Sequence, residues 1–206
     1  MPQLFTPSKD DIAELAPLDQ LGLENIVVVA NRAQAEQALQ LLHQCAVLGF
    51  DTESKPTFVR DEVSSGPHVV QFSTRQTAYV FQLHDDDSRE VVRTLLQAAH
   101  IIKVGFGLAG DHQQIRRTLN IEPRNVLDLN HVFRSQGYIK EIGIRGAVAV
   151  VFKRRFIKSR KATTSNWANR QLTPSQVIYS GNDAWAALLV FEALDLPSAA
   201  VAQPGG

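Results

Sequence analysis

The sequence predicts an α/β fold built on a mixed sheet. Several short apolar runs rich in β-branched residues come early in the chain, and later runs alternate with segments of helical periodicity. Runs that follow one another closely are typical of an antiparallel meander, whereas runs separated by a helix are typical of parallel strands. We therefore expect an early antiparallel part and later parallel strands.

Each strand is predicted from an apolar run bounded by polar or turn residues. The predicted strands are 26–30, 47–51, 68–73, 78–81, 101–104 and 126–128. The predicted helices are 32–43, 88–99, 109–119, 130–135, 144–152 and 174–194. We expect Asp87 or Ser88 to cap the second helix. Thr173, followed by Pro174 at the first helical position, is expected to cap the last.

Composition indicates a globular protein. The 206 residues include 21 basic and 21 acidic side chains, and 44% are hydrophobic, which excludes the usual signature of disorder. We expect an N-terminal arm at 1–24, one domain at 25–196 and a flexible tail at 197–206. No apolar run approaches the roughly 18 residues that span a bilayer. With no signal pattern and a single cysteine, Cys45, the chain is expected to be cytoplasmic, without a membrane partner.

Charge is unevenly distributed although its total is zero. Residues 140–170 carry nine bases and one acid, Glu141. A basic segment of this density indicates either a contact with a polyanion or a solvated loop, and charge alone does not decide between them.

A pair of acids stands at the end of the second predicted strand. Asp51 and Glu53 are two residues apart, so their side chains point to the same face. Adjacent carboxylates repel each other unless a cation neutralises them, and Mg²⁺ prefers such oxygen ligands. Taken alone, the pair is better explained as two solvated acids at a strand end.

A second acidic motif lies on the last predicted helix. Tyr179 and Asp183 are four residues apart and share the apolar face of this helix. An acid on a buried face must be paired, hydrogen-bonded or bound to a metal. A structural acid and a packed tyrosine are the alternative interpretation.

A third acid, Asp111, follows a glycine-rich bend after the strand at 101–104. It falls near the start of a helix, where the helix dipole favours a negative charge. Helix capping alone could therefore explain this residue.

In this order, the motifs resemble those of the DEDD exonucleases, a branch of the ribonuclease H-like superfamily. The first is Phe50-Asp51-Thr52-Glu53, the second runs from Val104 to Asp111, and the third is Tyr179-x-x-x-Asp183, of the tyrosine subtype. The resemblance covers residues 26–194 and extends to Gly143-Ile-Arg-Gly-Ala, Ser165-Asn-Trp and Leu172-Thr-Pro-Ser-Gln. The combination is similar to ribonuclease D and, more closely, to the exonuclease domain of the Werner syndrome helicase. It implies a ribonuclease H-like mixed sheet of about five or six strands flanked by helices.

The resemblance implies a 3′→5′ exonuclease that uses two divalent cations, Mg²⁺ or Mn²⁺, and releases nucleoside 5′-monophosphates. It assigns Asp51 to both cations, Glu53 and Asp183 to the first, and Asp111 to the second through water. Tyr179 would orient the attacking water. Two metals about 3.5–4 Å apart can activate the water and stabilise the leaving 3′ oxygen.

The expected substrate is single-stranded or 3′-recessed DNA or RNA. We expect Thr52 and Phe106 to contact it, with Phe106 at the terminal nucleotide, although core packing accounts for Phe106 equally well. In the basic segment Lys153–Lys161, we expect Arg154, Arg155 and Lys158 to hold the substrate backbone beside the active site.

Two other functions fit parts of the sequence. Gly105-Phe-Gly-Leu-Ala-Gly110 matches the dinucleotide-binding pattern G-x-G-x-x-G, with Asp128 placed as a ribose-binding acid, but this leaves the other acids unexplained. A non-catalytic nucleic-acid-binding module would explain the basic segment. The intact acidic set argues against it, because acids without metals repel phosphate.

Overall fold

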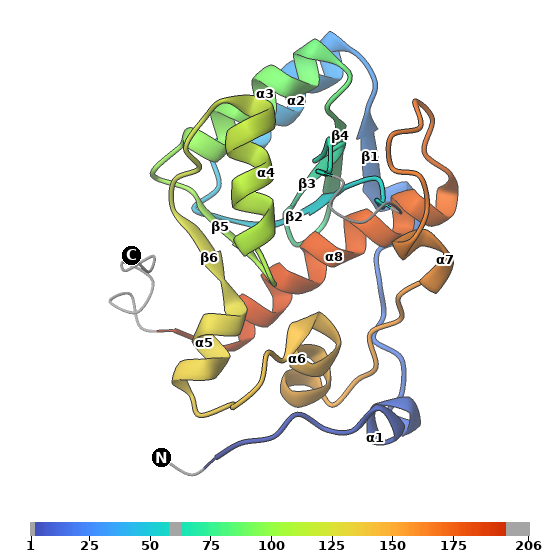
Figure 1. Ribbon diagram of the computed structural model, residues 1–206, viewed down its shortest axis with the longest axis vertical. Coiled ribbons are helices and arrows are strands. Elements are labelled where there is room, and N and C mark those ends of the chain that lie inside the picture. Colours follow the sequence, from blue (N-terminus) through green and yellow to red (C-terminus); the bar gives the residue numbers. More distant parts are fainter. Residues whose placement is uncertain (1–2, 58–62, 197–206) are drawn as a thin grey trace.

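Six strands form one mixed sheet at the centre of the protein (Figure 1). The computed structural model describes residues 3–57 and 63–196, and the predicted tail at 197–206 lies outside them. In order along the chain, the strands are β1 (Ile26–Val29), β2 (Val47–Glu53), β3 (Val69–Ser73), β4 (Ala78–Gln82), β5 (Ile102–Gly105) and β6 (Val126–Asp128). All six predicted strands are confirmed.

Strand pairing follows the expected change from antiparallel to parallel, with one difference. The order across the sheet is β1-β4-β3-β2-β5-β6, with β2, β3 and β4 antiparallel and β5 and β6 parallel to β2. β1 lies outside the antiparallel meander and pairs in parallel with β4, with Ile26 opposite Ala78. The meander leaves the outer edge of β4 open, and β1 pairs with that edge. The chain then crosses from β1 through the helix at 32–42 to the central strand β2.

Helices connect three pairs of consecutive strands, and others precede the first strand or follow the last. They are α1 (Lys9–Glu14), α2 (Arg32–Leu42), α3 (Asp86–Gln97), α4 (Ala109–Leu119), α5 (Leu129–Ser135), α6 (Gly143–Phe152), α7 (Arg160–Thr163) and α8 (Pro174–Ala193), with a 3₁₀ turn, η1 (Leu23–Asn25). The six predicted helices are confirmed to within a few residues. In the described part of the chain, none of them is long and apolar enough to cross a membrane.

Two helix starts differ from expectation. Asp85 caps α3 by accepting a hydrogen bond from the Ser88 amide, so the predicted cap at Asp87 or Ser88 is wrong by two or three residues. Asp86 and Asp87 instead occupy the first turn, where the helix dipole favours acids. The short helix α7 was not expected; Ser159 caps it. The predicted Thr173 cap and the proline after it are confirmed.

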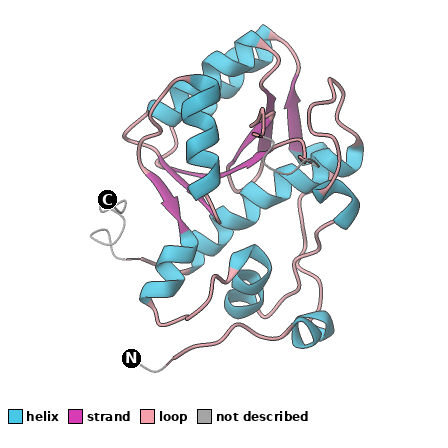
Figure 2. Cartoon of the chain, in the orientation of Figure 1, coloured by secondary structure: helices cyan, strands magenta, loops and turns pink. Residues whose placement is uncertain are grey.

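The sheet separates two layers of helices (Figure 2). On one face α2, α3 and α4 bury a core with Phe50, Phe72 and Phe81. On the other face α8 crosses β2, β3 and β4, and α6 packs on the outer side of α8. Most of α8 between Gln176 and Val190 is consequently buried, which explains why its apolar residues are not confined to one face.

A glycine on β2 lets α8 approach the sheet closely. A Cβ at Gly49 would overlap the carbonyl oxygen of Ala184 and lie 2.8 Å from its carbonyl carbon. Strand alternation places Gly49 on the same face as Asp51, and Ala184 directly follows Asp183 on α8. The close packing therefore brings the acids of the first and third motifs together.

Candidate active site

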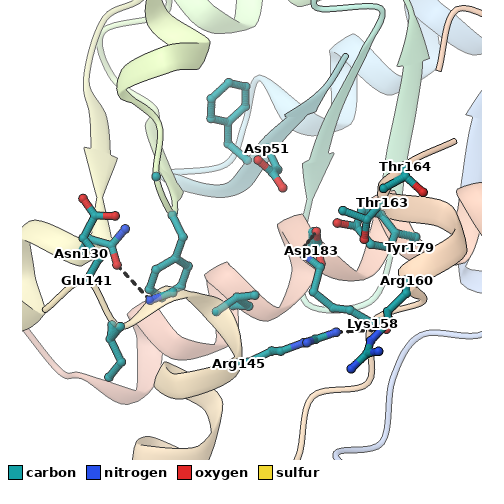
Figure 3. A pocket seen from close by; sticks show the side chains of 16 residues that line it. Asp51, Asn130, Glu141, Arg145, Lys158, Arg160, Thr163, Thr164, Tyr179 and Asp183 are labelled. Atoms are coloured by element: carbon teal, nitrogen blue, oxygen red, sulfur yellow. Dashed lines mark hydrogen bonds and ion pairs between the residues drawn. The ribbon is translucent and has the colours of Figure 1, made fainter. Parts of the chain in front are cut away.

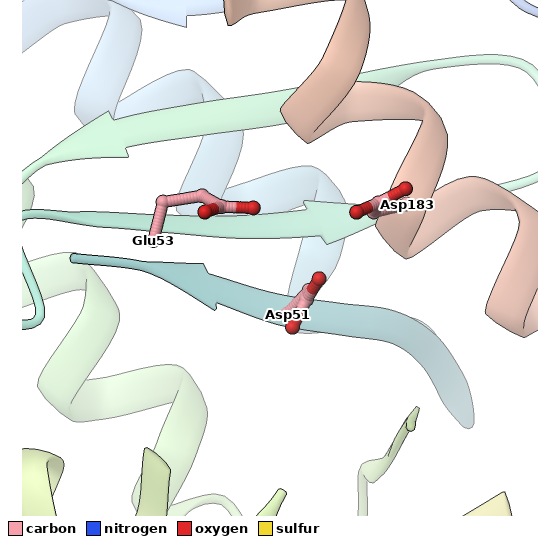
Figure 4. A group of neighbouring side chains, drawn as sticks. All are labelled: Asp51, Glu53 and Asp183. Atoms are coloured by element: carbon pink, nitrogen blue, oxygen red, sulfur yellow. The ribbon is translucent and has the colours of Figure 1, made fainter. Parts of the chain in front are cut away.

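Three carboxylates converge where β2 meets α8 (Figure 4). Asp51 and Glu53 come from the same face of β2, and Asp183 comes from α8. One carboxylate oxygen of each residue lies within 4.8 Å of those of the other two. The strand spacing and the helix position that single out these acids in the sequence therefore lead to one cluster.

Burial makes this cluster electrostatically unfavourable without a cation. The pKa of Asp51 is raised well above its ordinary value by burial and by the neighbouring Asp183 and Asp111 carboxylates. Burial and the charge of Asp51 likewise raise the pKa of Glu53. Such a set of oxygen ligands fits a hard divalent cation, which would stabilise the ionised forms.

A lysine already supplies part of the missing positive charge. Lys158 Nζ lies 2.5 Å from Asp183 Oδ2 and 4.7 Å from the centroid of the Tyr179 ring. Burial alone would lower the pKa of Lys158, but Asp183 and the other acids raise it above its ordinary value. One ammonium compensates one of three carboxylates, so the cluster can still accept cations.

Tyr179 lies one helical turn before Asp183. Both side chains line a cavity at the end of the acid cluster, which is described below (Figure 3). Its ring packs against Trp167, with ring centroids 5.8 Å apart, and only 7% of the residue is exposed. Burial and the Asp183 charge raise the pKa of its hydroxyl. The hydroxyl therefore stays protonated near neutral pH and can donate a hydrogen bond.

Asp111 stands beside the three-acid cluster. It lies in the first turn of α4, and its carboxylate accepts a hydrogen bond from the Thr52 hydroxyl. Burial raises the pKa of Asp111, whereas the Thr52 hydrogen bond lowers it. Thr52 thus contacts the Asp111 carboxylate directly, a role that the sequence did not indicate.

The glycine-rich bend before α4 is held by an acid. Both Asp128 oxygens accept backbone hydrogen bonds, from Gly107 at 3.1 Å and from Leu108 at 2.9 Å. In a dinucleotide-binding bend, such amides would face a pyrophosphate. Asp128 already occupies them here, which disfavours the dinucleotide-binding alternative.

A cavity of about 800 Å³ opens beside Asp51 and Asp183 (Figure 3). Phe106 lines it and stacks on Phe133, with centroids 6.4 Å apart. Its ring is therefore packed on one side and borders the cavity, while its contact with a terminal nucleotide stays a prediction. Besides Asp51, Tyr179 and Asp183, the cavity is lined mainly by residues of α5–α7 and the segments between them. The polar ones among these are Asn130, Glu141, Arg145, Lys158, Arg160, Thr163 and Thr164.

The basic side chains of the cavity differ in part from those expected. Lys158 lines it, together with Arg145 and Arg160. Among the described residues, Arg154 and Arg155 are not part of the lining, and Arg155 instead donates to the carbonyl oxygen of Ala13. Arg145 lies within the motif Gly143-Ile-Arg-Gly-Ala. That motif is the one feature of the sequence from which a place for Arg145 at the site could have been predicted.

Comparison with known proteins identifies the family of this chain. Residues 26–197 match a family described as 3′-5′ exonuclease. A mouse bifunctional 3′-5′ exonuclease/ATP-dependent helicase, WRN, is 25% identical over 150 residues, which are 72% of this chain and 11% of the mouse protein. An Arabidopsis thaliana 3′-5′ exonuclease is 23% identical over 157 residues, 75% of this chain and 54% of that protein. The chain thus spans only part of the length of these relatives.

Solved structures show the same fold. Trypanosoma brucei RNase D superimposes with a TM-score of 0.75 and 19% identity, covering 84% of this chain and 65% of the other. The Aedes aegypti Nibbler EXO domain gives a TM-score of 0.73 at 17% identity, covering 87% and 91% of the two chains. Together with the family match over most of its length, this likeness shows that the chain belongs to the 3′-5′ exonuclease family and has the ribonuclease H-like fold of the ribonuclease D and WRN exonucleases.

Proposed function

We propose that this chain removes nucleotides from the 3′ end of a nucleic acid by phosphodiester hydrolysis and releases nucleoside 5′-monophosphates. One observation carries the proposal: three carboxylates, one buried and two partly buried, lie within 4.8 Å of one another beside a large cavity with a basic wall. The acids fit cations and the basic wall fits phosphates, so the cavity combines the two requirements of a metal-dependent nuclease.

The acids are suited to hold two divalent cations, Mg²⁺ or Mn²⁺. Asp51, Glu53 and Asp183 would hold the first, and Asp51 together with Asp111, the latter through water, would hold the second. Bound divalent cations would activate the attacking water and stabilise the leaving 3′ oxygen. The donor set consists only of carboxylate oxygens, the ligands that these hard cations prefer.

Other side chains of the cavity would orient the attacking water and bind the phosphates of the substrate. The Tyr179 hydroxyl, beside Asp183, is placed to position the attacking water, with Glu53 nearby. Arg145, Arg160 and Lys158 line one wall and would hold backbone phosphates. Because Arg154 and Arg155 are not part of the cavity lining, we assign their expected role to Arg145 and Arg160.

Contacts with the substrate also involve less polar groups. Phe106 presents its ring to the cavity and would stack on the terminal base. Thr52 acts here through the Asp111 carboxylate that it contacts. We propose single-stranded or 3′-recessed DNA or RNA as the substrate. A structure of Trypanosoma brucei RNase D in complex with RNA U12 supports a nucleic-acid ligand for this fold.

Oligonucleotides labelled at the 3′ or the 5′ end test the proposal. Purified protein is incubated with DNA and RNA strands in Mg²⁺, Mn²⁺ or EDTA. We expect 5′-labelled strands to shorten stepwise in the presence of metal, with early release of a 3′ label as a mononucleotide. A strand with a 3′-phosphate should resist, because that charge would face the acids. Binding without cleavage in every metal would instead favour the non-catalytic binding module.

A further inference from the structure

The residues before the sheet lie along the wall of the candidate active site. In Figure 1 they run beside α6 and then pass the segment between α6 and α7. Leu4 forms a bridge with Tyr138, and its amide donates to the carbonyl oxygen of Gly137 at 2.9 Å. A Cβ at Gly146 of α6 would lie 2.5 Å from the Thr6 methyl group. The arm is therefore packed against the helix that carries Arg145.

The same arm is bonded to the segment that carries Lys158. The Arg155 amide donates to Ala16 at 2.8 Å, and the Leu18 amide donates to the carbonyl oxygen of Arg155 at 2.9 Å. The Arg155 guanidinium adds a bond to Ala13 at 2.7 Å. Gln20 Nε2 then donates to the carbonyl oxygen of Ile157, the residue before Lys158, at 3.2 Å.

A third link joins the arm to the other side of the Lys158–Asp183 ion pair. Asn182, which precedes Asp183 on α8, is 1% exposed. Its side-chain oxygen accepts from the Leu21 amide at 2.8 Å, and its side-chain nitrogen donates to the Leu21 carbonyl at 3.0 Å. Residues next to both partners of the ion pair are thus bonded to one continuous stretch of chain.

The segment between α6 and α7 is held by contacts with other parts of the chain, which include the packing of the buried Phe156 as well as the bonds to the arm. Residues 153–159 form no helix and belong to no strand of the sheet. Lys153 ends α6 in the left-handed region, with φ 55°. Fixing the backbone of one residue costs about 1–2 kcal/mol of conformational entropy, and only contacts made by the segment can offset that cost.

We propose that residues 3–21 are a positioning element of the active site, which holds Lys158 and the basic wall in place for substrate phosphates. The inference rests on the proposed function and adds a role for the arm. It predicts that loosening the arm weakens substrate binding while the acids on β2 and α8 stay in position. An arm that merely stabilises the fold would change the melting temperature and leave KM unaltered.

A chain lacking residues 1–17 tests this assignment, because the deletion removes Ala13 and Ala16, two of the three hydrogen-bond partners of Arg155 in the arm, and no lining residue of the cavity. We expect KM for a single-stranded oligonucleotide to rise about tenfold, which corresponds to about 1.4 kcal/mol of binding. We expect kcat at saturating substrate to stay within about twofold, and the salt slope of KM to fall by about 0.7 per lost phosphate contact. A folded deletion variant with an unchanged KM would overturn the proposal.

Point variants keep the test valid if the deletion prevents folding. Gln20→Ala removes only the bond to Ile157 and should raise KM in the same direction, to a smaller extent. Glu14→Gln is the matched control in the arm, because the Glu14 side chain is exposed and makes no hydrogen bond or ion pair in the described structure. Equal KM values for both variants and the wild type would contradict the inference.

Amide hydrogen exchange separates this inference from the proposed function. In the chain that lacks residues 1–17, we expect hydrogen exchange at the Arg155 amide to become about tenfold faster or more. Amides in β5 should keep their protection against exchange. This result does not require nuclease activity. An inactive wild-type protein would refute the proposed function alone, whereas unchanged exchange at Arg155 would refute the role of the arm.

Discussion

The Lys158 ammonium lies 2.5 Å from the Asp183 carboxylate, inside the group of acids that define the candidate active site. Only 4% of the Asp183 side chain and 19% of the Lys158 side chain are exposed. The pair removes the charge of one buried acid and leaves those of Asp51 and Glu53, whose pKa values remain raised by burial and mutual repulsion. The lysine and a bound divalent cation would therefore stabilise the same set of carboxylates.

Replacing this lysine should make the fold depend on metal. In Lys158→Met, Asp183 loses its partner, and breaking a buried ion pair in this way costs about 3–5 kcal/mol. We expect a lower melting temperature in EDTA and a larger rise on adding Mn²⁺ than the wild type shows, because ligands that bind the folded state stabilise it. Thermal unfolding at several Mn²⁺ concentrations measures both effects. Lys161→Met, at an exposed lysine, is the control; equal melting curves for the two variants would contradict the prediction.

Neutralising the central acid should abolish activity without unfolding the protein. Asp51→Asn removes a proposed ligand of both cations and should lower kcat about a thousandfold or more, since several kcal/mol of metal stabilisation are lost. Its melting temperature in EDTA should not fall, because a charge that repels Asp183 is removed. Steady-state nuclease rates and thermal melts provide the two readouts. Near-normal activity in this variant would show that the site is misassigned.

The tyrosine should contribute less than the acids. Tyr179→Phe keeps the ring that packs on Trp167 and beneath Lys158, and removes only the hydroxyl. We expect kcat to fall about ten- to a hundredfold, within the range of one positioned proton-transfer or orienting group. KM should change little. A loss as large as that of Asp51→Asn would mean that Tyr179 does more than orient water.

Two glycines provide a matched test of how α8 reaches the sheet. Gly49→Ala places a methyl group on the backbone of Ala184 and should push α8 away, at a cost of about 1–3 kcal/mol or more, with loss of activity. Gly110→Ala is the control, since a Cβ there meets nothing within 4 Å and the residue lies in α4. The control should be neutral or slightly stabilising. Comparable destabilisation of both variants, measured by denaturant unfolding, would contradict this explanation.

Much of the acidic centre could be predicted because it depends on local geometry. Strand alternation places Asp51 and Glu53 on one face, and helical periodicity places Tyr179 with Asp183, whatever the rest of the fold. The resemblance supplied the remaining step, that these two motifs and Asp111 belong to one site. The sheet followed for the same reason, since each strand is a distinct apolar run.

Features created by contacts between distant segments could not be predicted. Charge density marked Lys153–Lys161 but could not tell that Lys158 enters the acid cluster whereas Arg155 bonds to the arm. The position of β1 at the sheet edge depends on which edge the meander leaves open, not on the β1 sequence. Asp128 likewise gave no local sign that it would hold the glycine-rich bend.

A buried lysine far from the acids should make stability depend on pH. The Lys103 side chain is fully buried, and its ammonium donates to the carbonyl oxygens of Ala98 and Ile101, both at 2.9 Å. Burial lowers the pKa of Lys103 from its ordinary value of 10.5 to about 8. Between these two values the folded chain has released a proton that the unfolded chain retains.

The sign of the effect follows from this difference in proton binding. Stability rises with pH wherever the unfolded state binds more protons, so this group makes the fold more stable as pH increases from about 8 to 10.5. At about 1.4 kcal/mol for each tenfold change in proton affinity, the gain over that interval is roughly 3 kcal/mol. Lys103→Met removes the titrating group and keeps an apolar side chain of similar length. The free energy of unfolding of the wild type relative to this variant should therefore grow between pH 7.5 and 10, and a constant difference in denaturant titrations would show that Lys103 keeps its ordinary pKa.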